Sequence, residues 1–154
     1  MKKSILSLMV LAIAGLAFTG CDDVPMPYNQ PNVKPDTPSE VTPQGTGTAA
    51  APYNVAKAIE VVSALEANAQ TESEIYVKGA VKEIREIDPS YGNATYYITD
   101  DGKNQIYIYR SKYLGNTKFT SSDQLSVGDS VVVCGKFTNY SGNTPETVTN
   151  GSYL

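Results

Sequence analysis

Hydrophobic residues follow three different patterns along this chain. Residues 5–18 form an almost unbroken apolar run, interrupted by Ser7 and Gly15. Residues 51–70 carry apolar side chains at the three- and four-residue spacing of a helix, whereas the segments after Thr71 alternate between apolar and polar positions. These periods predict one amphipathic helix followed by a series of β-strands.

The predicted helix has a capping residue and one apolar face. The Asn54 side chain can accept a hydrogen bond from the free N–H groups of the first turn, and Asn68 can end the helix. The apolar face consists of Val55, Ala58, Ile59, Val62 and Leu65. A stripe of this kind packs on a core, so we do not interpret it as a partner-binding surface.

Five segments with a period of two predict five β-strands. They are residues 74–87, 94–100, 104–110, 130–140 and 145–150. The first segment alternates regularly through Val81, but Ile84 is out of phase with the residues before it. A change of phase within a strand predicts a bulge or bend near Lys82-Glu83.

Turns and loops set the order of these strands. Asp101-Gly102 predicts a tight hairpin between the second and third strands. The connection over residues 111–129 is long and has room for one helical turn near Ser122–Leu125. One helix, three strands, a crossover and two strands, with Gly79 in a bent first strand, fit a mainly β fold, the five-stranded OB-fold barrel. A flatter antiparallel sandwich is the alternative.

Four stretches of this domain resemble a known group of proteins. They are YVKGAVKEI, YGNATYYITDDG, VGDSVVVCGKF and NYSGNTPE, all within residues 53–154. These stretches resemble small OB-fold lipoproteins of Bacteroidetes, which are often described as nucleic-acid-binding on fold alone. The resemblance supports the fold far better than it supports a ligand, because one fold hosts many functions.

The N-terminal apolar run has the features of a secretion signal. Two lysines precede it, and its 14 residues are too few to cross a hydrocarbon core about 30 Å thick as a stable helix. Thr19-Gly20 then leads directly to Cys21, an arrangement that resembles a bacterial lipobox, although Phe18 stands where leucine is usual. The resemblance implies a signal peptide over residues 1–20 and acylation of Cys21. An ordinary signal peptide or an N-terminal membrane helix is the alternative.

Residues 21–50 have the composition of a tether. Six prolines lie between Asp22 and Ala50, and no apolar period survives there. Because proline removes a donor and fixes φ, we expect a disordered, extended linker between the lipidated Cys21 and an OB-fold domain over residues 51–154.

The same N-terminal residues predict where the protein resides. Acyl chains on Cys21 would anchor it to the outer membrane of the cell envelope. Asp22-Asp23 resembles the surface-export signal of Bacteroidetes lipoproteins, and a merely solvated start of the tether is the alternative. Both a periplasmic and a surface-exposed domain agree with this pattern, and nothing in the sequence indicates an oligomeric state.

Composition limits the chemistry of the domain. The chain has no histidine and two cysteines, so neither a histidine-activated nucleophile nor the usual zinc site can be built. Cys134 lies in an apolar run and is expected to be a buried small hydrophobe. Asp100-Asp101 precedes a turn glycine and lacks the alternating oxygens of a calcium loop. We therefore expect no enzyme activity, no metal and no cofactor.

Tyrosines are the candidate ligand-binding residues. OB-folds hold ligands on the face of their second and third strands, framed by two loops. If Ile106 and Ile108 face the core, Tyr107 and Tyr109 face outward, and Tyr97 takes the outer side of the preceding strand. The candidate set is Tyr97, Tyr107 and Tyr109, with Tyr91 and Tyr140 in the loops and Lys78 and Arg110 as local positive charges. Cross-strand pairs that only stabilise the sheet are the alternative.

Charge separates the two classes of function. Residues 51–154 contain nine Lys and Arg against twelve Asp and Glu. A nucleic-acid-binding domain usually has a basic surface, so single-stranded nucleic acid is the less expected partner. The preferred hypothesis is a displayed, non-enzymatic binding or adaptor module for a glycan or an envelope protein. A subunit of a larger envelope assembly, with the tyrosine face covered, is a further alternative.

Overall fold

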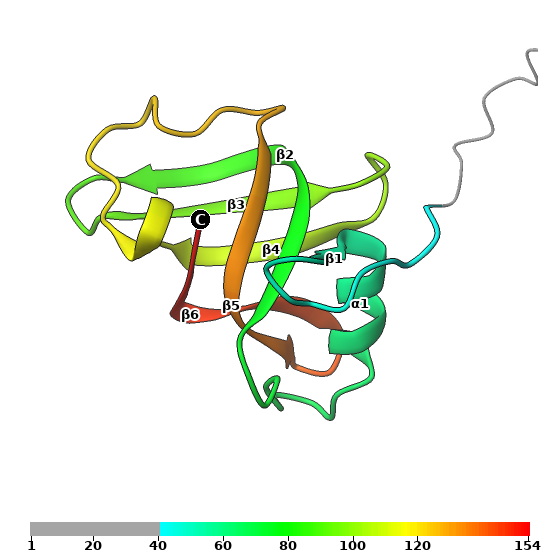
Figure 1. The fold of residues 1–154 in the computed structure, drawn as a ribbon. Helices are drawn as coiled ribbons and strands as arrows, with labels where there is room; N and C mark the ends of the chain where they lie inside the picture. The colour runs from blue at the N-terminus through cyan, green and yellow to red at the C-terminus, as the bar shows by residue number, and fades with distance from the viewer. Residues whose placement is uncertain (1–40) are drawn as a thin grey trace, which may run out of the picture. The chain divides into compact units, whose positions relative to one another are not determined.

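Five strands close into a small barrel in the computed structural model, which describes residues 41–154 (Figure 1). They are β2 (Ile75–Asp88), β3 (Asn93–Thr99), β4 (Gln105–Ser111), β5 (Ser130–Tyr140) and β6 (Thr144–Tyr153). Their order is β2–β3–β4–β6–β5, and β5 pairs again with β2. The β4–β6 pairing is parallel and the other four are antiparallel. This arrangement confirms the predicted OB-fold barrel.

The length and bend of β2 allow it to pair with two neighbours. Its residues 75–80 pair with β5, and its residues 80–88 pair with β3. The register with β3 shifts after Val81 and again after Ile84. The bulge predicted for this stretch is therefore present, and it turns the strand from one neighbour to the other.

A short segment before the helix lies along β2. Within it, β1 (Tyr53–Asn54) pairs in parallel with β2 and was not among the predicted strands. The Gly47 carbonyl accepts a hydrogen bond of 2.9 Å from a β2 amide, and the Gln44 carbonyl accepts one of 3.0 Å from Asn54 N. These contacts begin before the predicted start of the domain.

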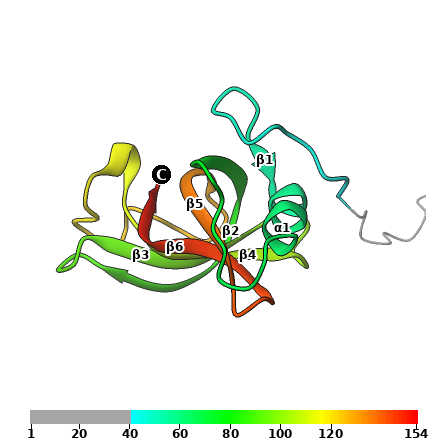
Figure 2. The ribbon, with the colours of Figure 1, turned by 90° about the horizontal axis from the view of Figure 1, so that it is seen from below.

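The helix α1 (Val55–Ser63) closes one end of the barrel (Figure 2). Asn54 caps it as predicted, because its side-chain oxygen accepts from Lys57 N at 3.0 Å. The carboxylate of Asp100 accepts from Ala56 N at 3.0 Å and adds a second cap. The inner face of the helix is fully buried in the hydrophobic core through Val55, Ala58 and Val62.

The helix ends earlier than the predicted end at Asn68. Its last residue is Ser63, and the Asn139 side chain donates hydrogen bonds to the carbonyls of Ser63 and Leu65, at 3.4 and 2.8 Å. A side chain from β5 thus satisfies carbonyls that a further turn of helix would have used.

The long connection from β4 to β5 closes the other end of the barrel. Its buried side chains are Phe119 and Leu125, and the ring centroid of Tyr113 lies 5.0 Å from that of Phe119. Phe119 N donates to the Gly92 carbonyl just before β3, whereas α1 is bonded to Asp100 just after β3. The helix and the long connection therefore close the barrel at opposite ends of β3.

The helical turn of this connection differs in place from the prediction. It is η1 (Leu114–Asn116), not a turn near Ser122–Leu125. In the predicted place the Gln124 side-chain oxygen accepts from the backbone N–H groups of Thr120 and Ser121, at 2.6 and 3.0 Å. A side-chain acceptor there replaces the helical carbonyls and holds an irregular loop.

Cys134 and the N-terminal residues were also the subject of predictions. Cys134 is a free, buried cysteine, as expected for a small hydrophobe. The predicted signal peptide, Cys21 and the tether as far as residue 40 lie outside the described residues. In the stretch that is described, no helix has the length and apolar character needed to cross a bilayer.

Removal of the Phe119 ring tests whether the β4–β5 connection closes this end of the barrel. Phe119 is fully buried, so we expect Phe119→Ala to lower the free energy of unfolding by about 3–5 kcal/mol. The matched variant Leu114→Ala, whose side chain is 58% exposed, is expected to change it by less than about 0.5 kcal/mol. Urea denaturation measures both free energies of unfolding. An equal decrease for the two variants would contradict the role of Phe119 in closing this end of the barrel.

Candidate functional site

Three tyrosine rings form a continuous row on the outer face of β3 and β4. Tyr97 is the register partner of Tyr107, and their ring centroids are 4.7 Å apart. The ring of Tyr109 follows along β4, 5.8 Å from that of Tyr107. The neighbouring Ile106 and Ile108 are fully buried, so strict alternation along β4 places its two tyrosines outside the barrel.

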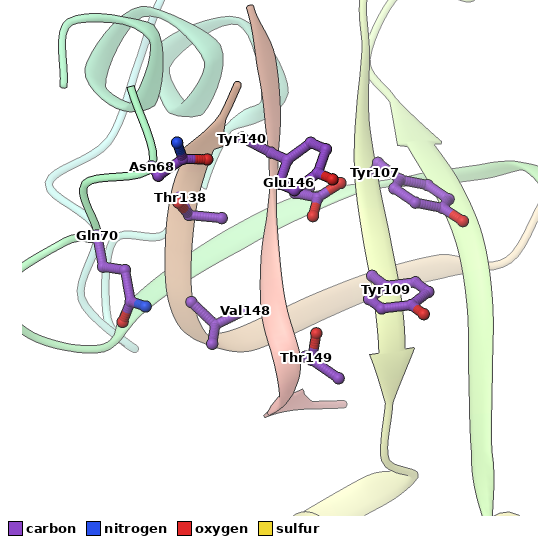
Figure 3. A pocket seen from close by; sticks show the side chains of 9 residues that line it. All are labelled: Asn68, Gln70, Tyr107, Tyr109, Thr138, Tyr140, Glu146, Val148 and Thr149. Atoms are coloured by element: carbon purple, nitrogen blue, oxygen red, sulfur yellow. The ribbon is translucent and has the colours of Figure 1, made fainter. Parts of the chain in front are cut away.

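A groove of about 550 Å³ lies beside this row (Figure 3). Strand β4 supplies Tyr107 and Tyr109, and the end of β5 supplies Tyr140, which is 55% exposed. The remaining lining residues come from the α1–β2 connection and from β5 and β6, and they are Asn68, Gln70, Thr138, Glu146, Val148 and Thr149. The groove therefore brings together three of the five predicted tyrosines.

The central charged group of the groove is Glu146, which the sequence analysis did not single out. Glu146 is the parallel register partner of Tyr107, and Figure 3 shows it on β6, with Tyr107 on the neighbouring strand β4. Burial raises the pKa of its carboxyl above the usual value. None of the hydrogen bonds or ion pairs found within residues 41–154 involves this carboxylate.

A signal for Glu146 was present in the sequence, but it could not be used alone. The adjacent Thr147 is fully buried, so alternation places Glu146 on the outer side of β6. Its partner could be identified only from the parallel β4–β6 pairing, which joins strands separated by the long crossover. Asn68 and Gln70 belong to the irregular α1–β2 connection, so no local period predicted that they line the groove.

Two arginines lie at the ends of the tyrosine row. The Arg85 guanidinium carbon is 6.0 Å from the Tyr97 ring centroid, and its Nη1 donates to Glu83 at 2.8 Å. The Arg110 guanidinium carbon is 5.2 Å from the Tyr109 ring centroid. Arg110 is thus next to the groove, whereas the charge of Arg85 is balanced by its carboxylate partner.

The other predicted residues lie away from the groove. Tyr91, in the β2–β3 turn, is 78% exposed and is not a lining residue. Its loop is held by Asp88, whose carboxylate accepts from the side chain of Ser90 and from two backbone amides, and these bonds lower the pKa of Asp88. Lys78 projects from the part of β2 that pairs with β1 and β5, and it does not line the groove either.

The acidic turn after β3 has a structural role. Asp101 Oδ1 accepts from Lys103 N and Asn104 N at 2.8 Å each, and these backbone hydrogen bonds contribute to a pKa below the usual value. Asp100 caps α1 instead. In the part of the chain that the structure describes, no three Cys, Asp or Glu side chains gather as a metal site.

The composition of the groove defines which contacts it offers. Tyrosine ring faces accept sugar C–H groups, aromatic rings or cations, and the Glu146 carboxylate accepts hydrogen bonds or pairs with a positive charge. The amides and hydroxyls around them can fix the orientation of a bound molecule.

The carboxylate at this position should lower the stability of the free protein. Because burial raises its pKa, the folded state binds this proton more tightly than the unfolded chain, and stability falls as pH rises through the interval between the two values. We expect Glu146→Gln to raise the midpoint of thermal unfolding at pH 7, and this gain should disappear at about pH 3, where the carboxyl is protonated in both states.

A second carboxylate of the same sheet face serves as the control. Glu83 is paired with Arg85 and lies outside the groove, so Glu83→Gln should leave the midpoint at pH 7 unchanged or slightly lower. An equal rise for both variants would show a general effect of net charge and would contradict the special environment of Glu146.

Comparison with known proteins adds no assignment to this geometry. No protein-family model matches the chain, and no curated protein matches its sequence. The ground for a function is therefore the groove on β4 and β6, together with the N-terminal sequence pattern.

Proposed function

We propose that this protein is a lipid-anchored, non-enzymatic binding protein of the cell envelope. Its OB-fold domain holds a glycan or protein ligand in the groove formed by β4, β6 and the α1–β2 connection. The observation that carries the proposal is the convergence of Tyr107, Tyr109 and Tyr140 on one groove. The groove also contains the Glu146 carboxylate, which has no ion-pair partner among residues 41–154. Sheet stabilisation alone would not need Tyr140, which projects from the β5–β6 end of the barrel.

The anchor rests on the sequence. The apolar run, Thr19-Gly20 and Cys21 follow the pattern of a lipoprotein signal, and the proline-rich residues after them suit a tether. An anchored protein with a ligand groove fits display of a binding site toward the periplasm or the cell exterior, with the lipid in the outer membrane.

Single-stranded nucleic acid is the second candidate. The Arg85 and Arg110 contacts with Tyr97 and Tyr109 favour it, since stacking with nearby positive charge is how such strands are bound. The groove argues against it, because its ionised side chain at neutral pH is a carboxylate, which repels phosphate.

A binding assay separates these candidates. The chain has 11 tyrosines and no tryptophan, so tyrosine emission of the full chain in detergent reports binding directly. We expect responses to members of a panel of oligosaccharides and peptides, and Tyr109→Ala should weaken binding about tenfold or more through lost stacking. Tyr91→Ala, outside the groove, should leave affinity unchanged.

An oligonucleotide measured at two salt concentrations completes the assay. Tight binding that falls steeply with salt would establish phosphate contacts and overturn the preferred proposal in favour of nucleic acid. A panel ligand that binds the Tyr91 and Tyr109 variants equally would overturn the assignment of the groove.

Lipidation is tested by one substitution. Expressed in a bacterium that processes lipoproteins and fed an alkyne fatty acid, the wild-type chain should incorporate the label, and Cys21→Ala should lose it completely. Cys134→Ala is the matched control and should retain the label, because that thiol is buried in the barrel. Label on the Cys21→Ala chain would contradict acylation at Cys21.

A further inference from the structure

The groove contains a carboxylate without a positive partner. Glu146 is partly buried beside Tyr107, its register partner, and burial raises the pKa of its carboxyl. The two ion pairs within the described residues are Lys57–Glu60 and Arg85–Glu83, and neither reaches it. A partly desolvated anion of this kind becomes more favourable when a cation approaches, since the attraction is strong where water is excluded.

The walls around this carboxylate suit a cation with an apolar stem. Strands β4 and β6 run parallel with Tyr107 beside Glu146, so two residues further on Tyr109 follows on β4 and Val148 on β6. Figure 3 shows Glu146 on β6 and Tyr107 on β4, with Val148 and Tyr109 further along these strands. An aliphatic stem can lie on the second pair while a charged head reaches the carboxylate and the ring faces.

The polar side chains of the groove are partly engaged already. The Asn68 side-chain oxygen accepts from Ser141 N at 3.0 Å, and the Thr138 hydroxyl donates to the Ala69 carbonyl at 2.9 Å. Glu146 is the one charged residue among those that line the groove, and it is acidic. Charge complementarity therefore favours a basic side chain over a neutral sugar.

We propose that the groove binds a lysine or arginine side chain of a partner polypeptide, with its stem against Tyr109 and Val148 and its cationic head at Glu146. This inference rests on the proposed binding function of the domain and names the ligand class of that same site. Tyr107 and Tyr140 flank the head and add cation–π attraction to the ion pair.

Two peptide probes of similar shape differ in the charge of one side chain, and two sugars test the alternative ligand class. They are the capped peptide Gly-Gly-Lys-Gly-Gly, its counterpart with norleucine for lysine, methyl glucosaminide as an amino sugar, and a neutral oligosaccharide. Binding is measured on the full chain in detergent from the NMR shifts of labelled tyrosine rings. We expect the lysine peptide to bind about tenfold or more tightly than the norleucine peptide.

Matched variants locate the effect. Glu146→Gln should remove the preference for lysine over norleucine, while Glu83→Gln, on the same sheet face but outside the groove, should keep it. Both variants are checked for a cooperative unfolding transition, so that a loss of binding is not mistaken for a loss of fold. Equal binding of the two peptides, or a lysine preference that survives in Glu146→Gln, overturns the inference.

The sugars distinguish this inference from the proposed function beneath it. If the oligosaccharide or the glucosaminide binds in a manner that depends on Tyr109 and the lysine peptide does not, the inference fails and the binding function stands. If no peptide and no sugar shifts the rings of Tyr107, Tyr109 or Tyr140, both fail.

Discussion

Closure of the barrel through one bent strand is the constraint on which the rest of the structure depends. β2 pairs with β5 along its first half and with β3 along its second, and two register shifts make the change of direction. Close backbone approach between β5 and β6, where their register also shifts, requires a residue without a Cβ, since a Cβ at Gly135 would lie 2.4 Å from the Gly151 carbonyl oxygen. Once the barrel is closed, every strand residue is assigned to the inside or the outside.

That assignment separates two sets of aromatic residues. Tyr96 and Phe137 are fully buried in the core. Tyr97, the next residue after Tyr96, lies on the outer face together with Tyr107 of the neighbouring strand. Burial raises the pKa of Tyr96 far above its usual value, which keeps its hydroxyl neutral in the interior. The outer rings are partly exposed and contribute less to the core.

If the groove has the proposed binding role, stability and recognition oppose each other there. We expect the Glu146 carboxylate, which has no cationic partner within the described residues, to lower the stability of the free protein and to attract a ligand. Backbone amides donate to the carboxylates of Asp100 and Asp101, and these hydrogen bonds give both residues a structural role. Burial still raises the pKa of Asp100, as it does for Glu146, whereas the pKa of Asp101 lies below its usual value.

By itself, the sequence determined the helix cap at Asn54, the bend in β2 and the outward parity of Tyr97, Tyr107 and Tyr109, because capping and alternation are local properties of the chain. Only the tertiary structure decided that β6 lies parallel to β4, that Glu146 therefore stands beside Tyr107, and that Tyr140 joins them while Tyr91 does not. These are contacts between segments far apart in sequence. No local period records them, since they follow from how the barrel closes.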